Sequence, residues 1–251
     1  MAHTVLFDNG THRNILIEDV SSGIAVQANQ HLVVHNKSGM ILDPGGHKVY
    51  SKVLAATRGL LQGAQLEKIF LSHQDPDIVA AVNGWLMTTD ATAYCPSLWV
   101  RFVPHFGLDH LVESRLLPIP DEGMILDLGG VGMKTIPAHF LHSPGNQQIY
   151  DPVSKILYSG DLGASLGQSY VEVPDFEAHL EYMTGFHRRY MAGNRAMKNW
   201  AKVARQLDIE IIAPQHGALF RGKPMVEKFI AWCEGLSCGL DVMDDVYRIP
   251  Q

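Results

Sequence analysis

The sequence predicts an α/β fold in which sheets pack under helices. Strand-like runs come first, and strands then mix with helical segments in both halves of the chain, as in a mixed α/β domain. Apolar residues make up 46% of the 251 residues and charged residues 18%, so the chain can bury a sizeable core. No Ser/Gly-rich linker and no solenoid repeat divides it. We therefore expect a single domain over residues 1–251.

The first half contains short runs of Val, Ile and Leu separated by Asn, Ser and Gly, which are typical of strands. The predicted strands are Thr4–Phe7, Asn14–Glu18, Ile24–Ala28, His31–His35 and Met40–Asp43. The last of them ends in a Pro-Gly-Gly turn. Val49–Leu61 has the apolar spacing of a helix, Lys68–Leu71 predicts a short buried strand, and Ile78–Met87 predicts a second helix.

The second half repeats this alternation with longer helices. The predicted strands are Ala91–Tyr94, Ser114–Ile119, Gly132–Ile136, Gln148–Tyr150, Ile156–Tyr158 and Glu210–Ala213. The predicted helices are Ser97–Val103, Pro174–Tyr190, Asn194–Gln206 and Pro224–Cys238. An Asp-Pro turn at 151–152 predicts a hairpin, and the Asp-Leu-Gly-Gly segment at 127–130 predicts another turn.

Composition argues against several classes of protein. The 20 Lys and Arg residues against 26 Asp and Glu give a net charge of −6, so no broad nucleic-acid surface is expected. The N-terminus lacks the features of a signal peptide, and no run of about 18 apolar residues predicts a membrane span. Cys95, Cys233 and Cys238 have no disulfide or zinc spacing and are expected to be free thiols. We expect a cytoplasmic protein.

Histidine and aspartate side chains follow the ends of four predicted strands. His73, Asp75 and Asp77 come at alternate positions after Lys68–Leu71. The other three strand ends lead to His139 and His142, to Asp161 and to His216. Each alone is more typical of a surface turn or a solvated loop, but four such coincidences favour one shared site at the strand ends. With 13 histidines and three cysteines, nitrogen and oxygen would ligate any metal.

Four motifs in order resemble those of the metallo-β-lactamase superfamily. They are His73-Gln74-Asp75-Pro76-Asp77, His142-Ser143-Pro144-Gly145, Gly160-Asp161 and His216-Gly217. The resemblance runs from about Ile24 to Gly217 and implies a four-layered αββα sandwich with a metal site at one edge between the sheets. Because the motifs come from both halves of the chain, one domain must build the site.

Departures from the superfamily motif indicate a particular branch. Asp75 stands where hydrolytic members have a second histidine, and Ile78 stands where they have a last one. The flavodiiron branch has a carboxylate at the position of Asp75. It also has a Phe-Leu-His segment like that at 140–142 here. Phe176 and the helix that ends at Tyr190 look like the flavodiiron insertion. The sequence most resembles stand-alone oxygen-binding diiron proteins, which are flavodiiron relatives without a flavodoxin domain.

This resemblance implies a set of ligand residues for each of two iron ions. The first iron would be held by His73, Asp75 and His142, the second by Asp77 and His216, and Asp161 would bridge them. His139 competes with His142, and the Ser-Pro-Gly that follows His142 favours His142. Asp75 is one methylene shorter than the family glutamate, which leaves its binding mode open. Ile78 cannot ligate, so the second metal should have an open or water-filled position.

A site with three imidazoles and three carboxylates suits redox iron better than zinc, which remains the alternative. When dioxygen oxidises a ferrous pair (Fe2+) to a ferric pair (Fe3+), a bound peroxide dianion restores the total charge. Asp43 is a candidate for orienting a ligand histidine, or it caps the turn that follows. Tyr190 could donate to bound oxygen, or it packs in the core.

We therefore expect a non-haem diiron protein that binds dioxygen as a bridging peroxide, as an oxygen sensor or carrier. The alternatives are an O2 or NO reductase core fed by a separate electron donor and a dinuclear zinc hydrolase. The sequence does not decide whether the protein is an enzyme, but an enzyme would be a reductase rather than a hydrolase. Only 34 residues follow Gly217 and no Gly-rich phosphate loop is present, so no bound flavin is expected. Expected partners are dioxygen, a redox or signalling protein, and a second copy in a homodimer.

Overall fold

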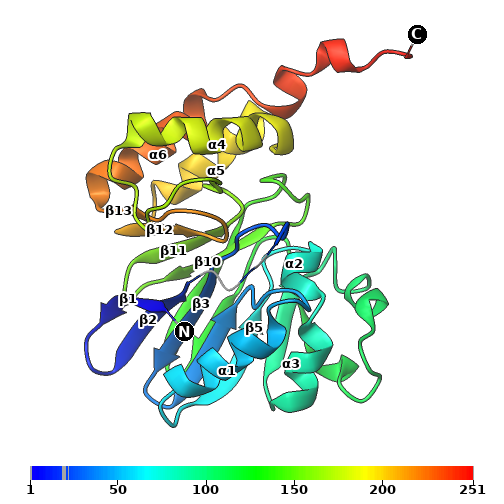
Figure 1. The fold of residues 1–251 in the computed structure, drawn as a ribbon, viewed down its shortest axis with the longest axis vertical. Helices are drawn as coiled ribbons and strands as arrows, with labels where there is room; N and C mark the ends of the chain where they lie inside the picture. The colour runs from blue at the N-terminus through cyan, green and yellow to red at the C-terminus, as the bar shows by residue number, and fades with distance from the viewer. Residues whose placement is uncertain (1, 19–20, 22, 251) are drawn as a thin grey trace.

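Two sheets face each other and carry helices on their outer faces, so the molecule has four layers (Figure 1). The structure, a computed structural model, describes residues 2–18, 21 and 23–250. Helices α4, α5 and α6 cover one sheet, and helices α1, α2 and α3 cover the other (Figure 1). This arrangement confirms the αββα sandwich that the sequence predicts.

The first sheet has seven strands among the described residues, in the order β1-β2-β3-β4-β5-β6-β7. Its strands are β1 (His3–Asp8), β2 (His12–Ile17), β3 (Gln30–His35), β4 (Ser38–Leu42), β5 (Gln65–Phe70), β6 (Thr92–Pro96) and β7 (Leu116–Ile119). Strands β1 to β4 are antiparallel, and β4 to β7 are parallel to one another. The carboxyl ends of β4 and β5 therefore lie side by side at one edge of the sheet.

The second sheet has six strands in the described part of the chain, in the order β13-β12-β11-β10-β9-β8. Its strands are β8 (Ile125–Leu128), β9 (Val131–Pro137), β10 (Gln147–Asp151), β11 (Ile156–Gly160), β12 (Ile211–Pro214) and β13 (Phe220–Arg221). The expected turn at 127–130 joins β8 to β9, and both Gly129 and Gly130 have positive φ there. A tight hairpin requires that conformation, which glycine adopts without steric cost.

Six α-helices among the described residues cover the sheets. They are α1 (Tyr50–Leu60), α2 (Pro76–Val79), α3 (Val82–Thr88), α4 (Phe176–Tyr190), α5 (Asn194–Ala204) and α6 (Lys223–Gly235). Short 3-10 turns occupy Val103–Phe106, Glu113–Arg115, Gly239–Asp241 and Asp244–Val246. The side chain of Asp175 accepts from the backbone N–H of Ala178 and so caps α4, the longest of these helices. None of the helices described has the length and apolar character that a membrane span needs.

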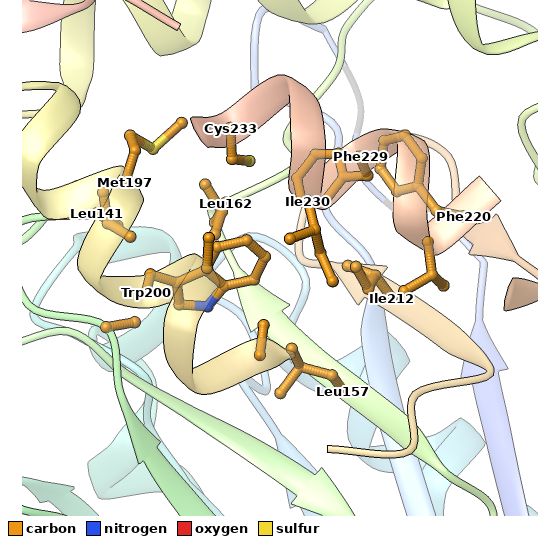
Figure 2. Packing of buried hydrophobic residues seen from close by; sticks show 14 of the residues in the cluster. Leu141, Leu157, Leu162, Met197, Trp200, Ile212, Phe220, Phe229, Ile230 and Cys233 are labelled. Atoms are coloured by element: carbon orange, nitrogen blue, oxygen red, sulfur yellow. The ribbon is translucent and has the colours of Figure 1, made fainter. Parts of the chain in front are cut away.

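Three apolar layers hold the four structural layers together. Successive residues of β2 alternate in direction, so Leu16 faces the second sheet while Ile15 and Ile17 face the helices. Figure 2 shows the third layer, in which residues of the second sheet pack against α5 and α6. Leu157 and Ile212 from that sheet lie in this layer together with Trp200 and Ile230 (Figure 2). Because both faces of the central strands are buried, the strands that lead to the site are rigidly placed.

Some expected elements differ in the structure. Residues 23–29 form no strand, because β3 already pairs with β2 and β4. Instead Asn29 crosses to the second sheet, where its side-chain amide donates to the carbonyls of Pro214 and Gly217. The helix expected over Ile78–Met87 is divided into α2 and α3. Ser97–Val103 is mostly turn, and the short strands β8 and β13 had no prediction.

Candidate metal centre

The predicted ligand residues meet at the edge of the sandwich where strands of both sheets end. His73 and Asp75 follow β5, and Asp77 lies in the first turn of α2. The second sheet supplies the other three residues, His142 after β9, Asp161 after β11 and His216 after β12. Each half of the molecule therefore contributes three side chains, in the crevice where such folds place their sites.

Four of these side chains form a compact first set. One ligand atom each from His73, Asp75, His142 and Asp161 lies within 4.8 Å of all the others. The Nε2 atom of His142 is 3.0 Å from Asp161 Oδ2 and 3.3 Å from Asp75 Oδ2. The Nε2 atom of His73 is 3.6 Å from Asp75 Oδ2 and 3.7 Å from Asp161 Oδ2. Two imidazole nitrogens and two carboxylate oxygens thus surround one point.

The remaining two residues form a second set that shares Asp161. The Nε2 atom of His216 lies 3.4 Å from Asp161 Oδ1 and 3.4 Å from Asp77 Oδ2. Asp161 therefore turns Oδ2 to the first set and Oδ1 to the second. A carboxylate placed in this way can bridge two metal ions.

Hydrogen bonding leaves the inward-facing atoms available for a metal. The Nδ1 atom of His216 donates to the carbonyl of Gln27, so in the neutral ring the Nε2 atom carries the lone pair. The Nδ1 atom of His73 lies 2.9 Å from Ser72 Oγ, which leaves its Nε2 atom facing the set. His73 Nε2 and Asp161 Oδ1 are buried without a hydrogen-bond partner. Buried polar atoms without partners are costly, and a shared cation would satisfy them.

Protons carry the positive charge of the site when no metal is bound. Burial acts to lower the pKa of His142, but hydrogen bonds and charge from Asp161 and Asp75 outweigh it and raise that pKa to about 10. Burial likewise opposes ionisation of His216, and Asp161 still raises the pKa of His216 to about 9. Burial acts to raise the pKa of Asp161, but His73, His142 and His216 hold it well below its usual range. The cluster is thus built for cations.

Several residues that sequence reasoning did not identify hold these ligands in place. Gln74 donates from Nε2 to Asp75 Oδ1, and Gln215 donates to Asp77 Oδ2. Ser72 connects His73 to the protein, because its Oγ contacts that ring and its N–H donates to Asp43 Oδ1. Asp43 is thus connected to His73 by hydrogen bonds through Ser72. Burial raises the pKa of Asp43 to about 6.

Position beside a ligand in the motif could have indicated Ser72, Gln74 and Gln215. No local signal could have indicated Gln27, which is 189 residues from the histidine that it binds.

The competing residue His139 lies apart from the cluster, with Nε2 2.8 Å from the carbonyl of Asp121. Tyr190 is half exposed at the mouth of the site rather than in the core. Its ring stacks on Phe186 and meets His142 edge-on, with ring centroids 5.6 Å apart. Together these rings help to line a cavity of about 550 Å³ that reaches the metal cluster.

Known proteins share this fold. Two solved structures of chemotaxis sensor ODP are 40% identical and cover 98% of this chain. The match covers 100% of the structure of the peroxy diiron species of that sensor, with a TM-score of 0.87. It covers 99% of the structure of the apo state from T. denticola, with a TM-score of 0.85. A flavo di-iron protein mutant from Thermotoga maritima is 19% identical over 93% of this chain and 61% of its own, with a TM-score of 0.76.

Among curated proteins, the anaerobic nitric oxide reductase flavorubredoxin of Klebsiella pneumoniae is 24% identical over 217 residues, which are 81% of this chain and 44% of that protein. The chain spans about half the length of the curated relatives that it matches. These findings confirm the resemblance to the flavodiiron branch of the metallo-β-lactamase superfamily. The family model described as ODP family beta lactamase matches residues 26–217, and the chain belongs to that family.

Proposed function

We propose that this protein holds two iron ions in the paired sets around Asp161 and binds dioxygen there as an oxygen sensor or carrier. The observation that carries the proposal is Asp161 itself, whose two oxygens face two different sets of ligand side chains. The similarity to chemotaxis sensor ODP, of which a peroxy diiron species is known, supports the choice of iron and dioxygen.

In this proposal His73, Asp75 and His142 hold the first iron, Asp77 and His216 hold the second, and Asp161 bridges. Ferrous iron would supply the electrons that reduce bound dioxygen. The chain itself fixes the ligand geometry: Gln27 sets the tautomer of His216, and the buried strands keep the ligand loops in register. Phe186 and Tyr190 shield His142 from one side with aromatic rings.

The donor set favours iron over zinc. Three carboxylates among six ligands form a harder and more anionic set than the histidine-rich sites in which catalytic zinc is usually held. A zinc hydrolase therefore fits the cluster less well. We assign dioxygen binding rather than catalytic turnover, and steady consumption of O2 or NO with a supplied donor would instead identify a reductase.

Ferrous reconstitution tests the proposal directly. The protein is loaded with Fe2+ without oxygen and then exposed to air while its visible spectrum is recorded. A charge-transfer band is expected in the wild-type protein and in H139A, because His139 lies outside the cluster. The same band should be absent from D161A, which has lost the bridging carboxylate. Absence of the band in the wild type, or an unchanged band in D161A, would contradict the proposal.

We further propose that the protein works in the cytoplasm as a homodimer and passes its signal to a separate protein. Light scattering coupled to size exclusion would give the mass, and about twice the 27.8 kDa of one chain is expected. A mass equal to one chain would refute the dimer without affecting the metal site.

A further inference from the structure

The two carboxylate oxygens of Asp75 have different surroundings. Oδ2 faces the imidazoles, 3.3 Å from His142 Nε2 and 3.6 Å from His73 Nε2. Oδ1 instead accepts a hydrogen bond of 2.9 Å from Nε2 of the neighbouring Gln74. Only one oxygen of Asp75 is therefore turned to the first set.

A chain of hydrogen bonds fixes the orientation of the Gln74 amide. The indole N–H of Trp99 can only donate, and it donates to Ser143 Oγ over 2.9 Å. The Ser143 hydroxyl is then free to donate its own proton, and it does so to Gln74 Oε1 over 2.7 Å. With Oε1 accepting, the amide must present its N–H group to Asp75. Acting through the Ser143 hydroxyl, the Trp99 indole thus determines which end of the Gln74 amide meets the carboxylate of Asp75.

The same chain joins the two loops that form the first set. Gln74 stands between His73 and Asp75 in the sequence, and Ser143 directly follows His142. A single hydrogen bond between the Ser143 and Gln74 side chains therefore ties together loops that are 69 residues apart. The expected consequence is a fixed position for Asp75 relative to both histidines.

We propose that Gln74, oriented by Ser143 and Trp99, is a positioning residue that limits Asp75 to one metal-binding oxygen and so keeps a coordination position of the first metal free for an external ligand. The proposal rests on the proposed metal site and deepens it, because it assigns the binding mode of the shortened carboxylate. A carboxylate with both oxygens free can bind a metal through either or both. Binding through both oxygens of Asp75 would require Oδ1 to give up its bond to Gln74.

Cobalt and azide test this without any turnover. The experiment uses the full chain with H216A as background, so that Co2+ fills the first set alone. In that background Q74L is compared with the unchanged Gln74 and with Q206L, a matched substitution of a glutamine whose amide donates to a helix carbonyl away from the cluster. The visible Co2+ spectrum reports coordination number, and titrated azide reports the free position.

Q74L should bind Co2+ at least as tightly as its parent, with weaker visible absorption as coordination number rises. Its azide dissociation constant should increase about tenfold, the effect of losing one charged hydrogen bond. W99F, which removes the indole N–H but keeps an aromatic ring, should change azide binding in the same direction by less, and Q206L should leave it unchanged. S143A provides the second route if Q74L does not fold, and it should also weaken azide binding.

Equal spectra and equal azide affinity in Q74L and its parent would overturn the role of Gln74. If Q74L does not fold, equal values in S143A and its parent would do the same. Failure of the wild-type chain and of the H216A background to bind Co2+ would count against the metal site itself, so the two failures are distinguishable.

Discussion

Buried histidines of this molecule have pKa values shifted in opposite directions, depending on what each ring meets. His142 lies beside Asp161 and Asp75, and these carboxylates raise its pKa to about 10 despite its burial. His31 is buried beside Tyr158 with no carboxylate to compensate, and burial lowers its pKa to about 4. The surroundings of His142 favour positive charge, whereas those of His31 favour the neutral ring.

The neutral ring of His31 predicts a loss of stability in acid. The pKa of His31 is about 4 when folded and 6.5 when unfolded, so the unfolded chain binds the proton more tightly. Its contribution to the free energy of unfolding is complete above pH 6.5 and is lost as the pH falls towards 4. In H31F, which keeps a ring against Tyr158, the loss between about pH 7.5 and 5 should be smaller by about 2 kcal/mol.

Urea denaturation with a chelator present measures this, with H110Q as control because that side chain is 83% exposed. Parallel pH profiles for H31F and the wild type would contradict the assignment.

The protonated site histidines predict that metal binding releases protons. At pH 7.5 the pKa values of about 10 and 9 leave His142 and His216 charged in the metal-free protein. Ligation needs the neutral imidazole, so each of these rings must lose its proton as the metal enters. We expect roughly two protons to be released at this pH. Calorimetry in buffers of different ionisation enthalpy counts them, and a count below one would show that the rings are already neutral.

At the scale of elements, α5 is held on the second sheet by a buried tryptophan with a polar contact. Trp200 packs against Phe229 (Figure 2). Its indole N–H donates over 2.7 Å to Gln148 Oε1 on β10. W200F keeps most of the packing but leaves that amide oxygen buried without a partner. The free energy of unfolding should fall by about 1–3 kcal/mol. The double variant W200F/Q148L should recover part of the loss in a urea titration, and additive losses would argue against the pair.

The sequence predicts elements well where one periodicity dominates. Phe176–Tyr190 forms a helix as expected, because its apolar residues repeat at helical spacing and Asp175 caps it. Ile24 shows why apolar runs can mislead, since it is fully exposed in a segment with no strand to pair with. The helix expected over Ile78–Met87 is interrupted at Ala80 and Ala81, and nothing in that run of apolar residues signals the break.

The ligand residues of the site can be predicted from the sequence, but the residues that orient them cannot. From the sequence alone, the ends of predicted strands indicate that His73 and His216 can lie at one edge. In the structure the parallel pairs β4–β5 and β11–β12 both end there. The residues that orient them are set by tertiary contact. Gln27 meets His216, and Trp99 meets Ser143, across long sequence separations that no local pattern encodes.

At the scale of the whole molecule, polar contacts join the two sheets at opposite ends. His12 on β2 and Asp151 on β10 form a pair of 2.6 Å whose side chains are fully buried. Asn14 donates to the same carboxylate. This pair lies where β10 ends, whereas Asp161 and the other ligand residues gather at the opposite edge. The sandwich is thus joined at one end by a buried histidine–aspartate contact and at the other by the proposed metals.

These two connections predict separable losses. D151A leaves His12 and Asn14 buried without their partner, so the metal-free protein should lose about 3–5 kcal/mol of stability. Because the ligand side chains are untouched, added Co2+ should still stabilise D151A by the wild-type increment, about 2.7 kcal/mol at a hundredfold excess over the dissociation constant. D161A should show the reverse, since it keeps the pair at the far end but loses most of the metal-dependent increment. Urea unfolding of both variants with and without Co2+ measures the two effects. If D151A also lost the increment, the two ends of the sandwich would be energetically coupled, and the metal centre would depend on the spacing of the sheets rather than on its own loops.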